Sequence, residues 1–369
     1  MNPPDHSSRA QRWPAFDGVR GLAVLAVICF HVYPSFFKGG YTGVDVFFVL
    51  SGFLITSLLT AEYDKYADIS FGKFYARRAL RLLPALAVVM IAAVVLVFAF
   101  GKLEPFRHET LIGLPFVAFY VGNWAIVVQA AALGVLSITW TLAIEEQYYL
   151  LWPLVLSRLL RRLDRQHLAY TLIGLAAVEM VVRLVLSYSN VSYNVITYST
   201  ATHSDGLLLG SGLGLLWSMG GAWRLRSEIA RRANALTIVG IAVPVLVLFF
   251  GTPSLHKVNL WVAVAVVATG LLLLGLVSRD DGLMNRVMEL PPLLWVGKRA
   301  YGFYLWHYPI FLVVYYEITS IHSHIHLVQL LLVLAGTFVV AGLSYRFVER
   351  PFLDRKARFS RVQLEASTS

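Results

Sequence analysis

The sequence predicts an all-α polytopic membrane protein with about ten transmembrane helices. Hydrophobic residues make up 58% of the 369 residues, and charged residues make up only 14%. Mean hydropathy is +0.67, which is far above that of soluble domains of this length. Runs long enough to cross a hydrocarbon core of about 30 Å lie at 16–36, 42–60, 80–100, 139–157, 168–188, 203–219, 235–250, 258–277, 299–319 and 327–348.

Basic residues decide the orientation of these runs. They cluster after every second run, at 65–81, 158–165, 224–232, 279–299 and 350–358, whereas the loops at 35–40 and 251–257 hold little positive charge. Because Lys and Arg mark cytoplasmic loops, we expect a multi-pass protein of the inner or plasma membrane with both termini in the cytoplasm. The net charge of +10 then reflects topology and lipid contact, and we expect no nucleic-acid partner.

The segment 110–128 is apolar, but glycine, proline and asparagine interrupt it. Counting it as a span would place the basic cluster at 158–165 outside, so we expect a re-entrant or interfacial segment there. We divide the chain into a cytoplasmic tail (1–15), a transmembrane domain (16–353) and a second cytoplasmic tail (354–369). We expect neither a cleavable signal peptide nor an appended soluble domain.

Arg20 and His31 are two polar residues within the first apolar run of the chain. Their eleven-residue offset places them on one helix face, roughly 16 Å apart along the axis. With Arg20 at the membrane edge, His31 would lie near the midplane. Such residues are costly in a bilayer and mark functional sites by default, although Arg20 can also snorkel and His31 can make a structural interhelical hydrogen bond.

Other polar residues recur near or inside the predicted spans. Arg77, Arg78 and Arg81 are three or four residues apart, and arginine binds phosphate oxygens in a bidentate manner. Thr141, Glu145, Tyr149 and Trp152 share one helix face, and Glu146 adjoins it. One of the two glutamates could orient His31 or pair with an arginine, and a structural ion pair is a close rival. Asp45, at the start of the second span, could bind an acceptor, polarise a histidine or cap its helix.

Six blocks in order resemble the acyltransferase-3 superfamily of integral-membrane acyltransferases. They are DGVRGLAVLAVICFH with GGYTGVDVFFVLSGFLIT, then YARRALRLLPAL, TWTLAIEEQYYLLWPL, THSDGLLLGSGLGLL, LWVGKRAYGFYLWHYPIF and YRFVERPF. The resemblance runs from about residue 13 to 353. It implies an acyl donor, usually acetyl-CoA, that is used from the cytoplasmic side, and an acceptor hydroxyl that is commonly on the far side. The expected acceptor is a surface polysaccharide, lipopolysaccharide or glycolipid.

The matched motifs assign roles that the residue chemistry supports. The family's Arg-then-His motif falls on Arg20 and His31, and neutral imidazole suits a general base that takes a hydroxyl proton. We expect His31, Glu145 and Asp45 in catalysis, and Arg20, Arg77, Arg78 and Arg81 on the CoA phosphates. The acceptor is assigned to Glu146, Tyr149, Trp140 and Asp205. Direct attack is favoured over an acyl-enzyme, and oligomeric state is left open.

Several alternatives remain beside this interpretation. Ser51 is a conceivable nucleophile, but small residues in mid-span usually serve helix packing. His203 stands where the family more often has arginine, while His307 and Glu349 match family positions in roles that are chemical or architectural. Cys29 is interpreted as packing, and we expect no metal at the histidine run 322–326. A transporter of acyl or lipid substrates, or an enzyme for a macrolide sugar, is the rival function.

Overall fold

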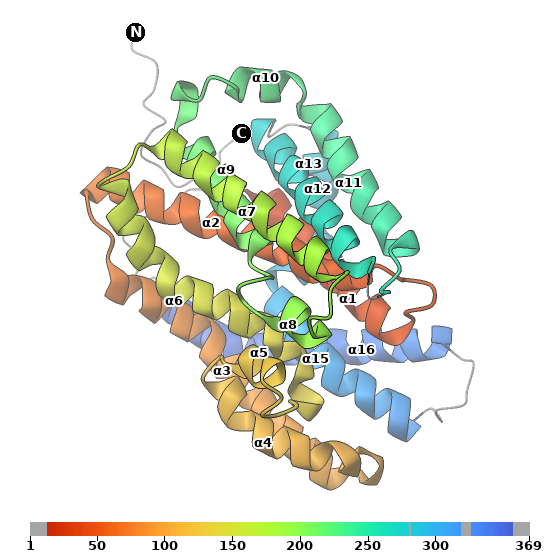
Figure 1. The fold of residues 1–369 in the computed structure, drawn as a ribbon. Helices are drawn as coiled ribbons and strands as arrows, with labels where there is room; N and C mark the ends of the chain where they lie inside the picture. Colours follow the sequence, from red (N-terminus) through yellow and green to blue (C-terminus); the bar gives the residue numbers. More distant parts are fainter. Residues whose placement is uncertain (1–12, 255, 280–281, 319–325, 357–369) are drawn as a thin grey trace.

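The computed structural model describes residues 13–254, 256–279, 282–318 and 326–356 (Figure 1). Within these residues all regular secondary structure is helical, which confirms the predicted all-α polytopic fold class. The first nine helices are α1 (Pro14–Val32), α2 (Gly43–Tyr66), α3 (Phe71–Ala99), α4 (Arg107–Ala118), α5 (Gly122–Val127), α6 (Trp140–Leu160), α7 (Arg165–Leu186), α8 (Tyr193–Tyr198) and α9 (Asp205–Ser218). The remaining eight are α10 (Arg226–Arg231), α11 (Ala233–Phe250), α12 (Val258–Ser278), α13 (Leu283–Met288), α14 (Pro291–Lys298), α15 (Ala300–Val313), α16 (His326–Ser344) and α17 (Arg350–Lys356).

Seven helical stretches among the described residues are long and apolar enough to cross a membrane: α1, α2 with the turn before it, α3, α7, α11, α12 and α16 with the helical turns after it. The other three predicted spans are also helical. They correspond to α6, which carries two glutamates, and to α9 and α15, which have 14 residues each. The chain is therefore a multi-pass membrane protein, and the number ten stays a prediction.

Helix α2 packs closely against α9, which in turn lies against α7 (Figure 1). Glycines permit this approach. A Cβ atom on Gly52 would lie 2.1 Å from the Leu207 carbonyl oxygen, and one on Gly210 would lie 2.1 Å from the Val49 carbonyl oxygen. Small residues let membrane helices come within backbone contact. The two helices thus form a seam with no room for side chains.

Helix α1 connects the two hydrophobic cores of the bundle. Its first half, including Phe16 and Val19, packs with α2, α9 and α12. Its second half, including Val27 and Ile28, packs with α3, α15 and α16. Because α1 contributes to both cores, its last turn is held between the two parts of the bundle. That turn carries His31.

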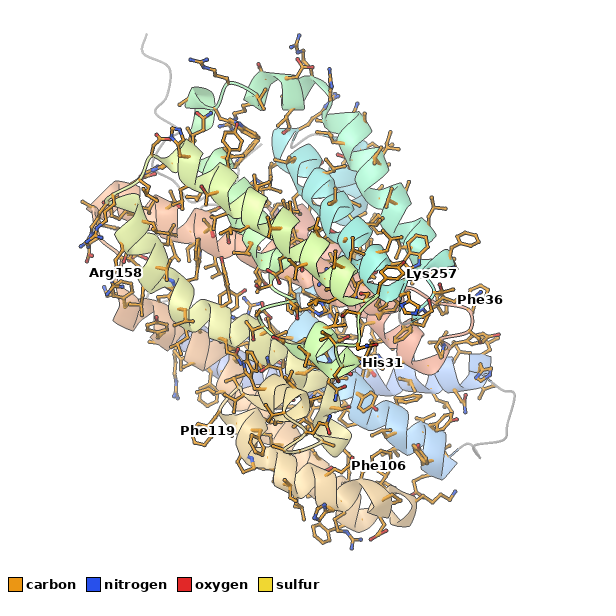
Figure 2. All side chains as sticks on the ribbon, viewed as in Figure 1. His31, Phe36, Phe106, Phe119, Arg158 and Lys257 are labelled. Atoms are coloured by element: carbon orange, nitrogen blue, oxygen red, sulfur yellow. The ribbon has the colours of Figure 1, made fainter. Side chains whose placement is uncertain are left out.

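The loops that the charge pattern assigns to opposite sides lie at opposite ends of the bundle, and which end faces the cytoplasm stays a prediction. Figure 2 places Arg158 at one end of the molecule and both Phe36 and Lys257 at the opposite end. The segment 110–128 is broken as predicted, into α4 and α5, with Tyr120 in a left-handed conformation (φ 53°) between them. Entry of this segment into the membrane stays a prediction.

Candidate functional site

His31 lies inside the bundle, one residue before the end of α1 (Figure 2). Its Nδ1 is 2.9 Å from the Val27 carbonyl oxygen. A carbonyl oxygen can only accept a hydrogen bond, so Nδ1 carries a proton, and in the neutral ring Nε2 then carries the lone pair. Backbone geometry therefore fixes the tautomer of a half-buried imidazole. The arrangement presents Nε2 as a proton acceptor.

A second imidazole, His307 of α15, lies beside His31. The two ring centroids are 5.1 Å apart. His307 is completely buried, and its Nδ1 donates to the Tyr304 carbonyl oxygen over 2.6 Å. Its Nε2 has no hydrogen-bond partner among the described residues. The sequence marked His307 only as a family match, because helices far apart in the chain had to be brought together to show the pair.

Three of the four predicted phosphate-binding arginines come together. Arg81 lies close enough to Arg20 and Arg78 for their positive charges to act on it, and it makes no ion pair or hydrogen bond with a described residue. Arg20 pairs with Asp17 at 3.0 Å. The fourth, Arg77, instead faces Glu62 of α2 at 4.0 Å. An unpaired guanidinium beside two others favours an anionic ligand.

Arg78 is held in place by α6. Its guanidinium donates to Glu146 over 2.6 Å and lies 3.4 Å from the centre of the Tyr149 ring. Both contacts restrict the side chain, one through charge and one through cation–π attraction. Of the roles that the sequence left open for the glutamates, pairing with an arginine is the one that Glu146 adopts.

Glu145 is the centre of a second set of contacts on α6. It accepts hydrogen bonds from Ser51 over 2.5 Å and from Tyr149 over 2.8 Å. One turn earlier, the Thr141 hydroxyl lies 2.7 Å from the Tyr304 hydroxyl. The predicted polar stripe of α6 therefore meets α2 and α15. It places hydrogen-bonding groups between the arginine cluster and His307.

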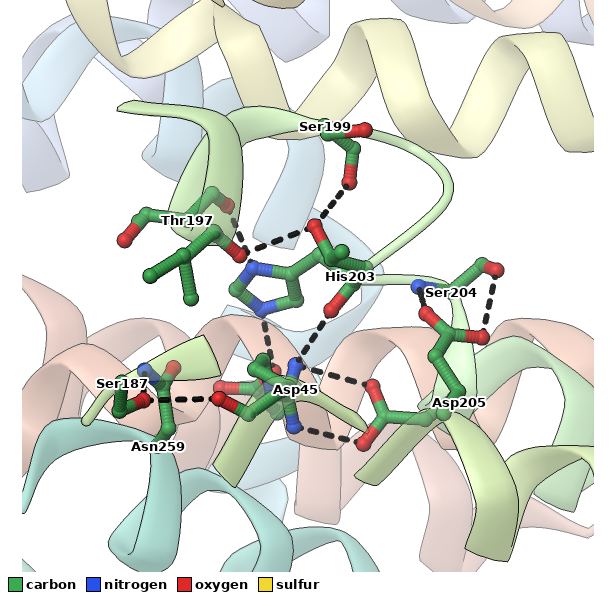
Figure 3. Close-up of polar contacts among 12 residues, drawn as sticks. Asp45, Ser187, Thr197, Ser199, His203, Ser204, Asp205 and Asn259 are labelled. Atoms are coloured by element: carbon green, nitrogen blue, oxygen red, sulfur yellow. Dashed lines mark hydrogen bonds and ion pairs between the residues drawn. The ribbon is translucent and has the colours of Figure 1, made fainter. Parts of the chain in front are cut away.

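The predicted residues Asp45 and Asp205 belong to a separate network at the starts of α2 and α9 (Figure 3). His203 lies 2.9 Å from Asp45 through Nε2 and 2.6 Å from the Thr197 carbonyl oxygen through Nδ1. Arg183 of α7 binds Asp205 through both amino groups, at 3.1 and 2.7 Å, with both side chains fully buried. The Asp205 carboxylate that the sequence assigned to the acceptor is thus occupied by Arg183.

Trp140 links this network to α6. Its ring packs 5.4 Å from His203 and 4.9 Å from Tyr198. Apart from His31 and Arg77, the predicted residues thus form two networks, one around Glu145 and the arginines and one around His203. Sequence reasoning missed Arg183, although a lone arginine inside an apolar run was a usable signal.

Among the described residues, no group of three or more histidine, cysteine, aspartate or glutamate side chains is arranged to hold a metal ion. His322 and His324 of the predicted non-metal run lie outside the described residues.

Comparison with known proteins identifies the family. The family model described as an acyltransferase domain matches residues 13–346. A peptidoglycan O-acetyltransferase, OatA, of Listeria monocytogenes is 33% identical over 352 residues, which cover 92% of this chain and 55% of the relative. The O-acetyltransferase OatA of Staphylococcus aureus is 34% identical over 355 residues, 92% of this chain and 57% of the relative.

The chain thus spans a little over half the length of these relatives. No solved structure matches it. The family model covers nearly all of the chain, including His31, the arginine cluster, α6 and the His203 network. The chain therefore belongs to the acyltransferase-3 family.

Proposed function

We propose that this chain transfers an acetyl group from acetyl-CoA to a hydroxyl of peptidoglycan, with His31 as the general base. The observation that carries the proposal is the fixed tautomer of His31. Its Nδ1–H is committed to the Val27 carbonyl oxygen. Nε2 is thereby kept as a lone pair for the proton of an attacking hydroxyl.

The arginine cluster supports an acyl donor that carries phosphates. Arg81 is unpaired among the described residues and is flanked by Arg20 and Arg78. Guanidinium groups bind phosphate oxygens with two parallel hydrogen bonds. These three side chains would hold the phosphates of CoA. The polar groups of α6 and α15 would then surround the extended arm that leads to the thioester.

The transfer itself needs few groups. The acceptor oxygen forms a bond to the acetyl carbonyl carbon as His31 takes its proton, and the carbon–sulfur bond breaks. CoA leaves as the thiol after its sulfur gains a proton. We favour this direct attack over a serine acyl-enzyme, because a small residue such as Ser51 in the middle of a span usually serves helix packing.

The acceptor is proposed from the relatives. Two proteins about one-third identical carry the names peptidoglycan O-acetyltransferase and O-acetyltransferase. We propose a sugar hydroxyl of the cell-wall glycan on the far side of the membrane from CoA. This topology keeps both termini and the basic loops in the cytoplasm of a multi-pass inner or plasma membrane protein.

The experiment uses the full chain in lipid nanodiscs. Purified protein is mixed with acetyl-CoA labelled in the acetyl group and with soluble peptidoglycan fragments. Release of free CoA and label in the glycan are followed together. Wild-type protein is expected to produce both in equal amounts, whereas His31→Ala is expected to produce neither.

A matched control separates chemistry from damage. His167→Ala removes an imidazole whose side chain is 89% exposed at the start of α7, and it is expected to behave as wild type. Transfer by His31→Ala at the wild-type rate would overturn the role of His31. Release of CoA without label in the glycan would contradict the proposed acceptor. If wild-type protein left acetyl-CoA intact, the proposal that this chain is an acetyltransferase that uses acetyl-CoA would be wrong.

A further inference from the structure

The imidazole of His307 is an unusual component for a purely structural position. Its side chain is fully buried within α15, and its Nε2 has no hydrogen-bond partner among the described residues. A buried polar atom without a partner lowers stability. A phenylalanine or leucine would fill the same volume without this cost. The position therefore calls for an explanation that uses the nitrogen.

The hydrogen bonds of His307 define what that nitrogen can do. Nδ1 donates to the Tyr304 carbonyl oxygen over 2.6 Å, so Nε2 holds the lone pair. His31 has the same tautomer through its bond to the Val27 carbonyl. Two neutral imidazoles thus lie side by side, each with a proton-accepting Nε2. The ring centroids are 5.1 Å apart, and His307 Nε2 makes no hydrogen bond to His31.

His307 also occupies an intermediate place along the polar groups of the bundle. On one side its ring contacts His31, and on the other it lies 5.5 Å from the ring of Tyr304. The Tyr304 hydroxyl in turn contacts Thr141 on α6, one turn before Glu145. His31 lies near the end of α1 that is distant from Arg20. His307 thus stands between His31 and the side from which the donor would enter.

We propose that His307 is a second catalytic residue, which protonates the sulfur that leaves the acetyl group. This inference rests on the proposed acetyl transfer. The acceptor hydroxyl gives its proton to Nε2 of His31, and its oxygen bonds to the acetyl carbon while the carbon–sulfur bond breaks. The proton passes from His31 to Nε2 of His307 and on to the sulfur. The products are the acetyl ester and the CoA thiol, so every proton is accounted for.

A second imidazole gives the leaving sulfur a proton donor of its own, beside the base that takes the hydroxyl proton. The titratable groups that face His307 are few: His31 on α1, and Tyr304 and Tyr308 on its own helix. Of these, only a histidine readily carries a proton near neutral pH.

The test varies the leaving group instead of the protein alone. His307→Gln keeps a polar side chain of similar length but cannot carry a proton. With acetyl-CoA its kcat is expected to fall at least about 100-fold, the usual contribution of a general acid, with KM unchanged. With S-(4-nitrophenyl) thioacetate, whose thiolate leaves without a proton, the same preparation is expected to keep at least a third of the wild-type rate.

This second donor also shows that the variant is folded, because activity with it requires an intact site. His108→Gln, at an exposed position of α4, is the matched control and is expected to match wild type with both donors. Equal losses with both donors would overturn leaving-group protonation, as would an unchanged kcat with acetyl-CoA. Activity of His31→Ala equal to wild type would instead contradict the proposed function, so the two failures are distinguishable.

Discussion

His203 binds Asp45 through Nε2 at 2.9 Å while its other ring nitrogen faces the Thr197 carbonyl oxygen at 2.6 Å (Figure 3). The Thr197 carbonyl oxygen can only accept a hydrogen bond, so Nδ1 carries a proton, and Nε2 is the atom that contacts the Asp45 carboxyl group.

Removal of His203 is predicted to destabilise the protein. His203→Ala leaves Asp45, which is 2% exposed, as a buried carboxylate without its partner. The free energy of unfolding is expected to fall by about 3–5 kcal/mol, as when one member of a buried ion pair is removed. Titration of the protein with sodium dodecyl sulfate in mixed micelles measures this. If His167→Ala lowered the free energy of unfolding equally, the loss could not be attributed to the buried contact between His203 and Asp45.

Arg81 is predicted to act on donor binding. Arg81→Gln removes a guanidinium that makes no ion pair among the described residues, although its charge acts on the nearby Glu349 carboxyl. We expect KM for acetyl-CoA to rise about tenfold, equivalent to about 1.4 kcal/mol, with kcat within a factor of two. Steady-state kinetics in nanodiscs measures both.

The control for Arg81 is the neighbouring arginine that faces elsewhere. Arg77 lies opposite Glu62, so Arg77→Gln is expected to leave KM for acetyl-CoA within a factor of two. If both variants raise KM equally, the weaker donor binding reflects the loss of positive charge in general. The proposal that three arginines form the phosphate site would then be wrong.

Ser51 is predicted to position Glu145 and to form no acyl-enzyme. Its hydroxyl donates to the Glu145 carboxylate over 2.5 Å, and Tyr149 remains as a second donor when Ser51 is replaced. Ser51→Ala is therefore expected to lower kcat by about 150-fold at most, since one hydrogen bond to a charged group contributes up to about 3 kcal/mol. An acetyl group on Ser51, found by mass spectrometry of quenched enzyme, would contradict this prediction.

A side chain added at the glycine contacts between α2 and α9 is predicted to lower the stability of the protein. Gly52→Ala places a Cβ 2.1 Å from the Leu207 carbonyl oxygen, so the helices must separate, and we expect a loss of about 1–3 kcal/mol in the free energy of unfolding. Gly174→Ala is the matched control, because nothing lies within 4 Å of its added Cβ on α7. It is expected to leave stability unchanged or to raise it by up to about 1 kcal/mol. The same sodium dodecyl sulfate titration compares them.

Some features of the fold and of the candidate site follow from local sequence, whereas others depend on how the helices pack. Hydropathy and basic loops predicted the long helices and the break near Tyr120, because apolar length and turn residues are local properties. The face shared by Thr141, Glu145 and Tyr149 followed from helical periodicity. By contrast, the partners of Arg77, Asp205 and His307 lie on other helices, and only packing brings them together.

The motif matches likewise identified site residues without identifying the residues that contact them. They marked Arg78 and Arg81 together, but they did not show that Glu146 and Tyr149 hold Arg78 while Arg81 stays unpaired. The difference arises because residue spacing fixes a helix face, whereas the neighbour of that face depends on how the helices assemble.

The glycine seam also limits how the bundle can move. Helices α2 and α9 touch through their backbones at Gly52 and Gly210, so neither can slide or part without losing contact along its length. The loop after α8 is held differently, because Thr200 meets α5 and α6 through side-chain hydrogen bonds with Asn123 and Gln147. One contact thus depends on backbone shape and the other on polar side chains.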